Sequence, residues 1–185
     1  LQSDIEKIRL TLEELDRDSF EKAVDAIVSA RKLYIIGVRS CAAMATFMSF
    51  YFNLIFDNVV KVSATTASEV FESLLRVGEG DVVIGVSFPR YSSRTVQAMN
   101  FARSRGATTI AITDSEVSPL SPISTYTLKA RSDMASFVDS LVAPLSLINA
   151  LLVAVSRKKN DDLANTFEDL EKIWEEYGVY EKVQE

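Results

Sequence analysis

The sequence contains no histidine, and it has only one cysteine, six glycines and four prolines in 185 residues. Histidine is the side chain that most often acts as an acid or base near neutral pH, and it is the commonest zinc ligand. Its absence excludes histidine-dependent catalysis, and we expect no metal. Few glycines and prolines argue against a turn-rich all-β chain. The single Cys41 excludes an intrachain disulfide and predicts a buried thiol in a reducing compartment, the cytoplasm.

Basic residues are also fewer than acidic residues. Lysine and arginine number 20 against 26 acidic residues, which gives a net charge of −6. A negatively charged protein is repelled by the phosphate backbone of a nucleic acid. We therefore do not expect this chain alone to bind DNA. The apolar segments 41–56 and 141–155 are shorter than the ~18 to 20 residues that span a bilayer. We interpret both as buried core helices and expect no membrane partner.

From residue 33 onward, short apolar runs alternate with helical stretches. This alternation is typical of repeated βα units, and it predicts an α/β fold with a parallel sheet. The predicted strands cover residues 33–38, 59–62, 81–87, 108–113 and 124–128. The predicted helices between and after them cover residues 40–56, 66–76, 92–105 and 137–157.

Amphipathic helices are predicted at both ends of the chain. Ile5, Ile8, Leu12 and Leu15 recur at helical spacing and indicate a short connector helix. A second helix is predicted to begin at Asp18 or Ser19, with Glu21 as the partner in a capping box. A final helix after Asn160 carries one apolar stripe, which we expect to pack on the domain or on a partner subunit.

Two turns of the predicted sheet combine hydroxyls with arginines. Ligands bind beyond the carboxyl ends of parallel strands, where helix N-termini favour anions. The first turn holds Arg39 and Ser40, and the second, 86–95, holds Ser87, Arg90 and Ser92. Ser40 and Ser92 could be ordinary helix N-caps. Capping explains neither Ser87 nor the arginines, so the two turns together favour an anion pocket.

The anion is predicted to be a small phosphorylated metabolite. Neither the G-x-G-x-x-G fingerprint nor the G-x-x-x-x-G-K-[ST] loop occurs, so no nucleotide cofactor is expected. Glu69 follows Thr66 by three residues, which fits either a capping box or a place at the rim of the pocket. Asp139 could likewise cap a helix or reach a sugar hydroxyl, and the sequence leaves both cases open.

Three stretches carry a resemblance to a known family: IIGVRSCAAMA (35–45), VSFPRYSSRTVQAMNFARSRGATTIAITD (86–114) and FVDSLVAPLSLINALLVAV (137–155). The chain resembles a sugar isomerase (SIS) domain over about residues 20–180, and more narrowly the C-terminal effector domain of RpiR-type bacterial transcriptional regulators. The resemblance implies a three-layer αβα sandwich with a five-stranded parallel sheet and flavodoxin-type winding. It also implies a phosphosugar bound after the first and third strands.

The resemblance assigns roles to the residues of the two turns. Ser40, Ser87 and Ser92 match phosphate-binding hydroxyls, Arg39 and Arg90 lie in the same loops, and Glu69 matches a carboxylate that borders the sugar in related enzymes. Catalytic SIS proteins usually carry an S-x-S-G-E-T turn. Here Pro89, Arg90 and Tyr91 stand at the positions of its second Ser, Gly and Glu, and Cys41 replaces a frequent serine. We therefore expect binding without a catalytic residue.

The leading interpretation is a phosphosugar sensor. Residues 1–18 would connect a missing N-terminal helix-turn-helix domain, which alone would contact DNA, to a phosphosugar-binding domain over residues 19–185. The expected assembly is a homodimer or homotetramer. The rival interpretation is a stand-alone phosphosugar isomerase, and a third is a dimerisation module with an empty pocket.

Overall fold

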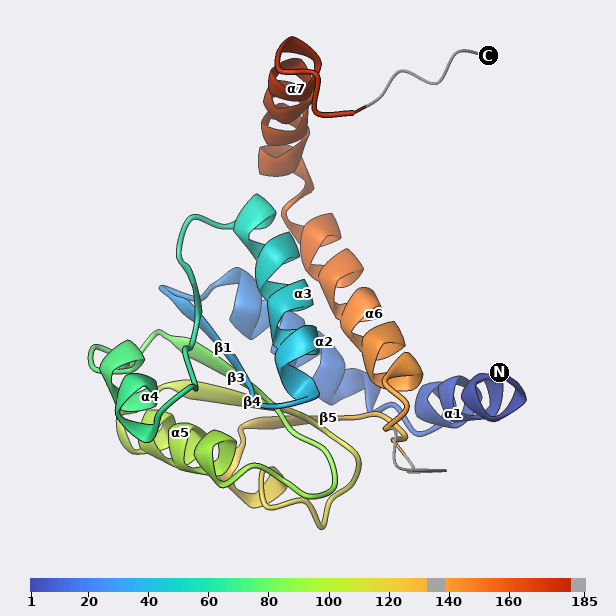
Figure 1. Ribbon diagram of the computed structural model, residues 1–185, viewed down its shortest axis with the longest axis vertical. Helices are drawn as coiled ribbons and strands as arrows, with labels where there is room; N and C mark the ends of the chain where they lie inside the picture. The colour runs from blue at the N-terminus through green and yellow to red at the C-terminus, as the bar shows by residue number, and fades with distance from the viewer. Residues whose placement is uncertain (133–138, 181–185) are drawn as a thin grey trace.

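A five-stranded parallel sheet lies at the centre of the computed structural model, which describes residues 1–132 and 139–180 (Figure 1). The strand order is β2-β1-β3-β4-β5. The strands are β1 (Leu33–Gly37), β2 (Val59–Lys61), β3 (Val82–Val86), β4 (Thr108–Thr113) and β5 (Tyr126–Lys129). All five predicted strands are present, and the order is that of flavodoxin-type winding.

Helices cover both faces of the sheet and form the outer layers of the sandwich. On one face α2 (Arg17–Val28), α3 (Cys41–Ile55) and α6 (Val142–Lys158) pack against the sheet. On the other lie α4 (Ala67–Ser73) and α5 (Ser93–Ser104). Helices α1 (Gln2–Glu13) and α7 (Asn160–Glu176) flank this body, and a short 3-10 helix covers Ser121–Ile123. β1 and β3 are buried along their whole length, which explains their continuous apolar sequence.

The winding of the sheet reverses between β1 and β3. The chain leaves β1 toward β2 on one side, and β3 then pairs with the other side of β1. In the register of this pair Gly37 lies opposite Val86, so both strands end level with each other. The turns after β1 and β3 therefore leave the sheet side by side, at the position where open α/β sheets bind ligands.

Gly37 allows α3 to begin close against the end of β1. A Cβ atom at residue 37 would lie 2.4 Å from the Cys41 carbonyl oxygen, which is backbone and cannot turn aside. We expect Gly37→Ala to lower the free energy of unfolding by about 3 kcal/mol through this overpacking. Gly78→Ala is the matched control, because its nearest neighbour lies at 3.8 Å. Urea denaturation measures both changes, and equal stability of the two variants would contradict the expectation.

The beginning of the chain differs in two details from the prediction. Asp16, and neither Asp18 nor Ser19, caps α2: its carboxylate accepts hydrogen bonds from the backbone N–H groups of Asp18 and Ser19. The reason is backbone conformation, because residue 16 is extended and the helix begins directly after it. In α1, Ile5 and Leu12 are exposed, whereas Thr11 is buried and its Oγ1 accepts a hydrogen bond from the Arg131 N–H.

The last two helices also depart from the predicted bounds or packing. The predicted start of the long apolar helix, Phe137, lies outside the described residues, and α6 begins at Val142. The predicted final helix is confirmed as α7, which projects beyond the end of α6 (Figure 1). Ile173 of α7 and Tyr177, the residue after its end, are exposed. Within residues 1–132 and 139–180, no helix combines the length and the apolar character needed to cross a membrane.

Candidate functional site

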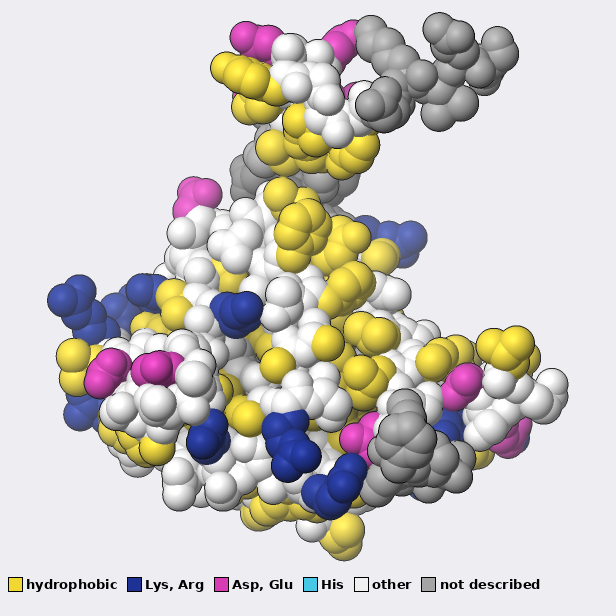
Figure 2. Space-filling model, viewed as in Figure 1, with side chains coloured by type: hydrophobic (Ala, Val, Ile, Leu, Met, Phe, Trp, Pro, Cys, Tyr) yellow, Lys and Arg dark blue, Asp and Glu magenta, His cyan; other side chains and the backbone are white. Residues whose placement is uncertain are grey.

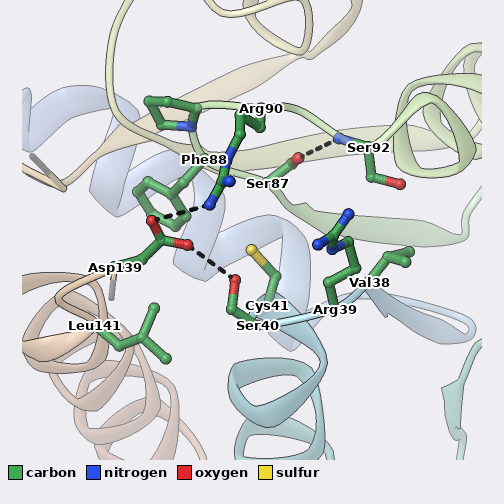
Figure 3. Close-up of a pocket in the computed structure, with 11 residues that line it drawn as sticks. Val38, Arg39, Ser40, Cys41, Ser87, Phe88, Arg90, Ser92, Asp139 and Leu141 are labelled. Carbon is green, nitrogen blue, oxygen red and sulfur yellow. Dashed lines mark hydrogen bonds and ion pairs between the residues drawn. The ribbon is translucent and has the colours of Figure 1, made fainter. Parts of the chain in front are cut away.

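A pocket opens where the turns after β1 and β3 meet, and it has a volume of about 460 Å³ including its solvent-filled mouth (Figure 3). The start of α3, the turn before α5 and the segment before α6 form its walls. Five of the six predicted site residues line it together: Arg39, Ser40, Ser87, Arg90 and Ser92. The other lining residues are Val38, Cys41, Phe88, Pro89, Asp139 and Leu141.

The three serines of the pocket differ in their hydrogen-bond partners. Ser87 is buried, and its Oγ accepts a hydrogen bond of 3.1 Å from the Ser92 N–H. Ser92 is the N-cap of α5, and its Oγ accepts from the Thr95 N–H at 3.4 Å. Ser40 precedes α3 with helical backbone angles and makes no capping hydrogen bond. The capping interpretation therefore holds for Ser92 and is wrong for Ser40, whose hydroxyl points into the pocket (Figure 3).

Both pocket arginines have a left-handed backbone. Arg39 has φ of 58° and Arg90 has φ of 65°, and no other non-glycine residue in the described part of the chain has a positive φ. This conformation costs a residue with a Cβ about 1 kcal/mol or more. By the resemblance to catalytic SIS proteins, Arg90 stands at a glycine position, and glycine adopts this backbone conformation without strain. Backbone strain of this kind concentrates at functional sites.

Asp139 brings a carboxylate into the same pocket. Its Oδ2 accepts a hydrogen bond of 3.4 Å from Ser40 Oγ, and its Oδ1 lies 3.8 Å from Nη2 of Arg90 (Figure 3). Of the two uses that the sequence left open, capping is not observed, because the residue at the N-cap of α6 is Leu141 and makes no side-chain cap. No sequence pattern predicts its pairing with Ser40 and Arg90, because both residues are distant from Asp139 along the chain.

Glu69 does not line this pocket. Its N–H donates to Thr66 Oγ1 at 3.3 Å, as the capping-box interpretation requires, and its carboxylate accepts a hydrogen bond of 2.7 Å from Ser63 Oγ. The bond from Ser63 lowers the pKa of Glu69. Ser63 itself lines a neighbouring hollow of about 730 Å³, which shares Val38 and Arg39 with the pocket. Glu69 is thus linked to the hollow through one hydroxyl.

The part of the chain that forms this pocket matches a protein-family model. The model of the SIS domain matches residues 26–154, which include both turns and all five strands. The chain belongs to the SIS domain family. This SIS domain is 27% identical over 167 residues to an uncharacterized HTH-type transcriptional regulator of Caldanaerobacter subterraneus, a match that covers 88% of this chain and 58% of the relative. The chain spans about half the length of the curated relatives it matches.

Two solved structures have the same fold as this SIS domain. The sugar isomerase domain of an RpiR transcription factor from Sphaerobacter thermophilus superposes with a TM-score of 0.83 at 28% identity, covering 92% of this chain and 95% of that one. The NanR protein of Vibrio vulnificus, solved in complex with ManNAc-6P, has a TM-score of 0.80 at 21% identity, covering 93% of this chain and 67% of that one. The fold of this SIS domain is thus that of the RpiR sugar isomerase domain and of NanR.

The acid–base chemistry of the SIS pocket is sparse. Burial raises the pKa of the Cys41 thiol, so this group stays protonated and weakly acidic at neutral pH. Tyr91, which stands at the glutamate position of the enzyme turn, donates its hydroxyl to Asp114 Oδ1 at 2.7 Å in the loop after β4. Among the described residues that line the pocket, Asp139 is the one carboxylate. The polar groups of the pocket are thus mainly serine hydroxyls and arginines, which are hydrogen-bond donors.

Proposed function

We propose that this chain is the phosphosugar-sensing effector domain of an RpiR-type transcriptional regulator of carbohydrate metabolism. The observation that carries the proposal is the pocket at the switch point of the sheet, where three serine hydroxyls meet two arginines. The similarity to HTH-type regulators over most of the chain supports the regulatory role. The sugar phosphate bound by NanR, a protein of the same fold, supports the class of ligand.

The phosphate of the ligand would lie between the two turns. Hydroxyls of Ser40 and Ser87 would donate to its oxygens, and the guanidinium of Arg90 would add charge-assisted hydrogen bonds. The N-termini of α3 and α5 face the same space, so both helix dipoles favour a negative charge there. The sugar would extend toward the neighbouring hollow past Arg39, where Lys61 and Ser63 offer polar contacts.

Residues 1–18 would form the connector to a DNA-binding domain. α1 and α2 precede the sheet, and α1 lies beside the start of α6, close to the pocket wall (Figure 1). A net charge of −6 on this chain suits a domain that leaves DNA contact to another part of the regulator. Ligand binding in the cytoplasm would then reach DNA through these helices.

Isothermal calorimetry tests the proposed ligand class. The chain is titrated with N-acetylmannosamine 6-phosphate, glucose 6-phosphate and the two corresponding free sugars. We expect at least one phosphorylated sugar to bind about 100-fold or more tightly than its free form, because two charge-assisted hydrogen bonds of ~1.5 kcal/mol each account for that ratio. Equal affinity for the two forms would contradict a phosphate site.

A second expectation concerns assembly. Phe50, Tyr51 and Val153 are exposed by 60%, 42% and 50%, and Figure 2 shows hydrophobic side chains gathered over α3 and α6. Exposed apolar surface of this kind marks a protein interface, and symmetric homodimers are its commonest form. We expect light scattering to give at least twice the 20.5 kDa chain mass and Val153→Glu to shift the assembly toward monomer. A monomer mass at micromolar concentration would contradict this.

A further inference from the structure

The carboxylate of Asp139 lies against the groups that would bind the proposed phosphate. It contacts Ser40 and Arg90, which are two of the groups expected to bind the ligand. Both contacts are long, at 3.4 Å and 3.8 Å, and the Asp139 side chain keeps 24% of its surface exposed. Long contacts to a partly solvated carboxylate are weak, so an incoming anion with better geometry can replace them.

The residue after Asp139 is bonded to the N-terminal helix. Ser140 Oγ donates a hydrogen bond of 2.6 Å to Asp4 Oδ1 in α1. α1 is tied a second time to the segment after β5, because the Arg131 N–H donates to Thr11 Oγ1 at 2.9 Å and the Arg131 side chain pairs with Glu14. Asp139 is therefore one residue from a hydrogen bond that attaches the start of α1.

We propose that Asp139 is an internal anion which a phosphate displaces from the pocket, and that its displacement releases α1 through Ser140 and Asp4. This inference rests on the proposed function, and it gives that function a route from the pocket to the connector. A doubly charged phosphate beside Ser40 and Arg90 repels the Asp139 carboxylate, because like charges brought together at a binding site are strongly unfavourable. When Asp139 moves, Ser140 moves with it, and its bond to Asp4 breaks.

The energetic coupling must act in both directions. If phosphate binding loosens α1, then a change that loosens α1 must raise phosphate affinity. Removing the Asp139 carboxylate should raise this affinity directly, because it removes the charge that phosphate must displace. Asp139→Asn keeps the size of the side chain and removes its charge. Asp57→Asn is the matched control, because it makes the same charge change at the far end of α3, away from the pocket.

Titration with inorganic phosphate, followed by calorimetry, measures the first half of the inference. We expect Asp139→Asn to bind phosphate at least about tenfold more tightly than the unaltered chain, because a like-charge contact is removed. Asp57→Asn should bind as the unaltered chain does. If Asp139→Asn binds phosphate no more tightly than the unaltered chain, the inference is overturned while the proposed function stands. If neither binds phosphate or any sugar phosphate, both fail.

Hydrogen–deuterium exchange over α1 measures the second half of the inference, the release of α1 when phosphate binds. In the unaltered chain, phosphate should speed the exchange of amides in Gln2–Glu13 several-fold. In Asp139→Asn these amides should exchange fast without phosphate and respond no further. Ser140→Ala should still bind phosphate, yet its α1 should show no response, because the link to Asp4 is gone. An α1 that exchanges equally with and without bound phosphate in the unaltered chain would overturn the coupling.

Discussion

Replacing Ser87 by alanine is expected to weaken sugar-phosphate binding about 10- to 100-fold, the loss that follows from one hydrogen bond to a charged group. Ser87 follows β3 directly, and its side chain is 3% exposed. Its Oγ already accepts the Ser92 N–H, which leaves the hydroxyl proton to donate to a phosphate oxygen. Alanine removes this donor and also leaves the Ser92 N–H without its acceptor, so the turn loses part of its preorganisation.

Ser104→Ala is the matched control for this experiment. Ser104 lies at the end of α5, is exposed, and donates its hydroxyl to the Phe101 carbonyl. Calorimetry with the sugar phosphate that binds most tightly should give unchanged affinity for Ser104→Ala and the expected loss for Ser87→Ala, with the far-UV circular dichroism of both variants unaltered. Full affinity in a folded Ser87→Ala variant would show that the phosphate lies elsewhere.

The fold and the location of the pocket could be predicted from the sequence because both depend on local pattern. Continuous apolar runs such as 33–38 and 81–87 indicate strands buried on both faces, and the helical stretches between them require parallel pairing. Given a parallel sheet, the residues after each strand must lie at one edge. Arg39, Ser40, Ser87 and Ser92 follow from that rule together with the resemblance to SIS domains.

The electrostatic arrangement of the pocket could not be predicted, because it depends on contacts between distant segments. Asp139 lies 99 residues from Ser40, and no spacing in the sequence records their hydrogen bond. Glu69 has the right residue type, yet the structure bonds it to Ser63 and places it outside the pocket wall. The left-handed backbone of Arg90 could be predicted in part. Catalytic SIS proteins usually carry glycine at this position, and glycine adopts that conformation without strain.

Strain and charge at the pocket favour a ligand with two or more negative charges. Arg39 and Arg90 are both held in a costly backbone conformation, and a phosphate that bridges the two turns would stabilise them in place. Asp139 partly neutralises Arg90 when no anion is bound. If phosphate displaces Asp139 as proposed, a ligand with a single charge would gain less from the exchange, and the contacts that hold Asp139 would also discriminate among anions.

The chain is further expected to bind its sugar phosphate without converting it. Aldose–ketose isomerisation requires a base that moves a proton between adjacent carbons and an acid that opens the ring, and each contributes ~10² to 10⁴ in rate. The chain has no histidine, and Tyr91 is bonded to Asp114 in another loop. Asp139 lies 3.8 Å from Arg90 and is the one carboxylate among the described residues of the pocket wall. The thiol beside it, Cys41, is a poor acid because burial raises its pKa.

Proton exchange in heavy water tests this expectation directly. The chain is incubated with a hexose phosphate and a pentose phosphate that bind it, and NMR follows deuterium incorporation at the carbon next to the carbonyl. We expect exchange no faster than without protein, because binding alone supplies neither proton transfer. An ordinary turnover rate is ~1 s⁻¹ or faster. Exchange at such a rate would establish an isomerase if it were lost in Asp139→Asn or in Glu69→Gln. A sensor must leave its ligand unchanged, because a ligand that is consumed reports flux through the site and not the concentration around it.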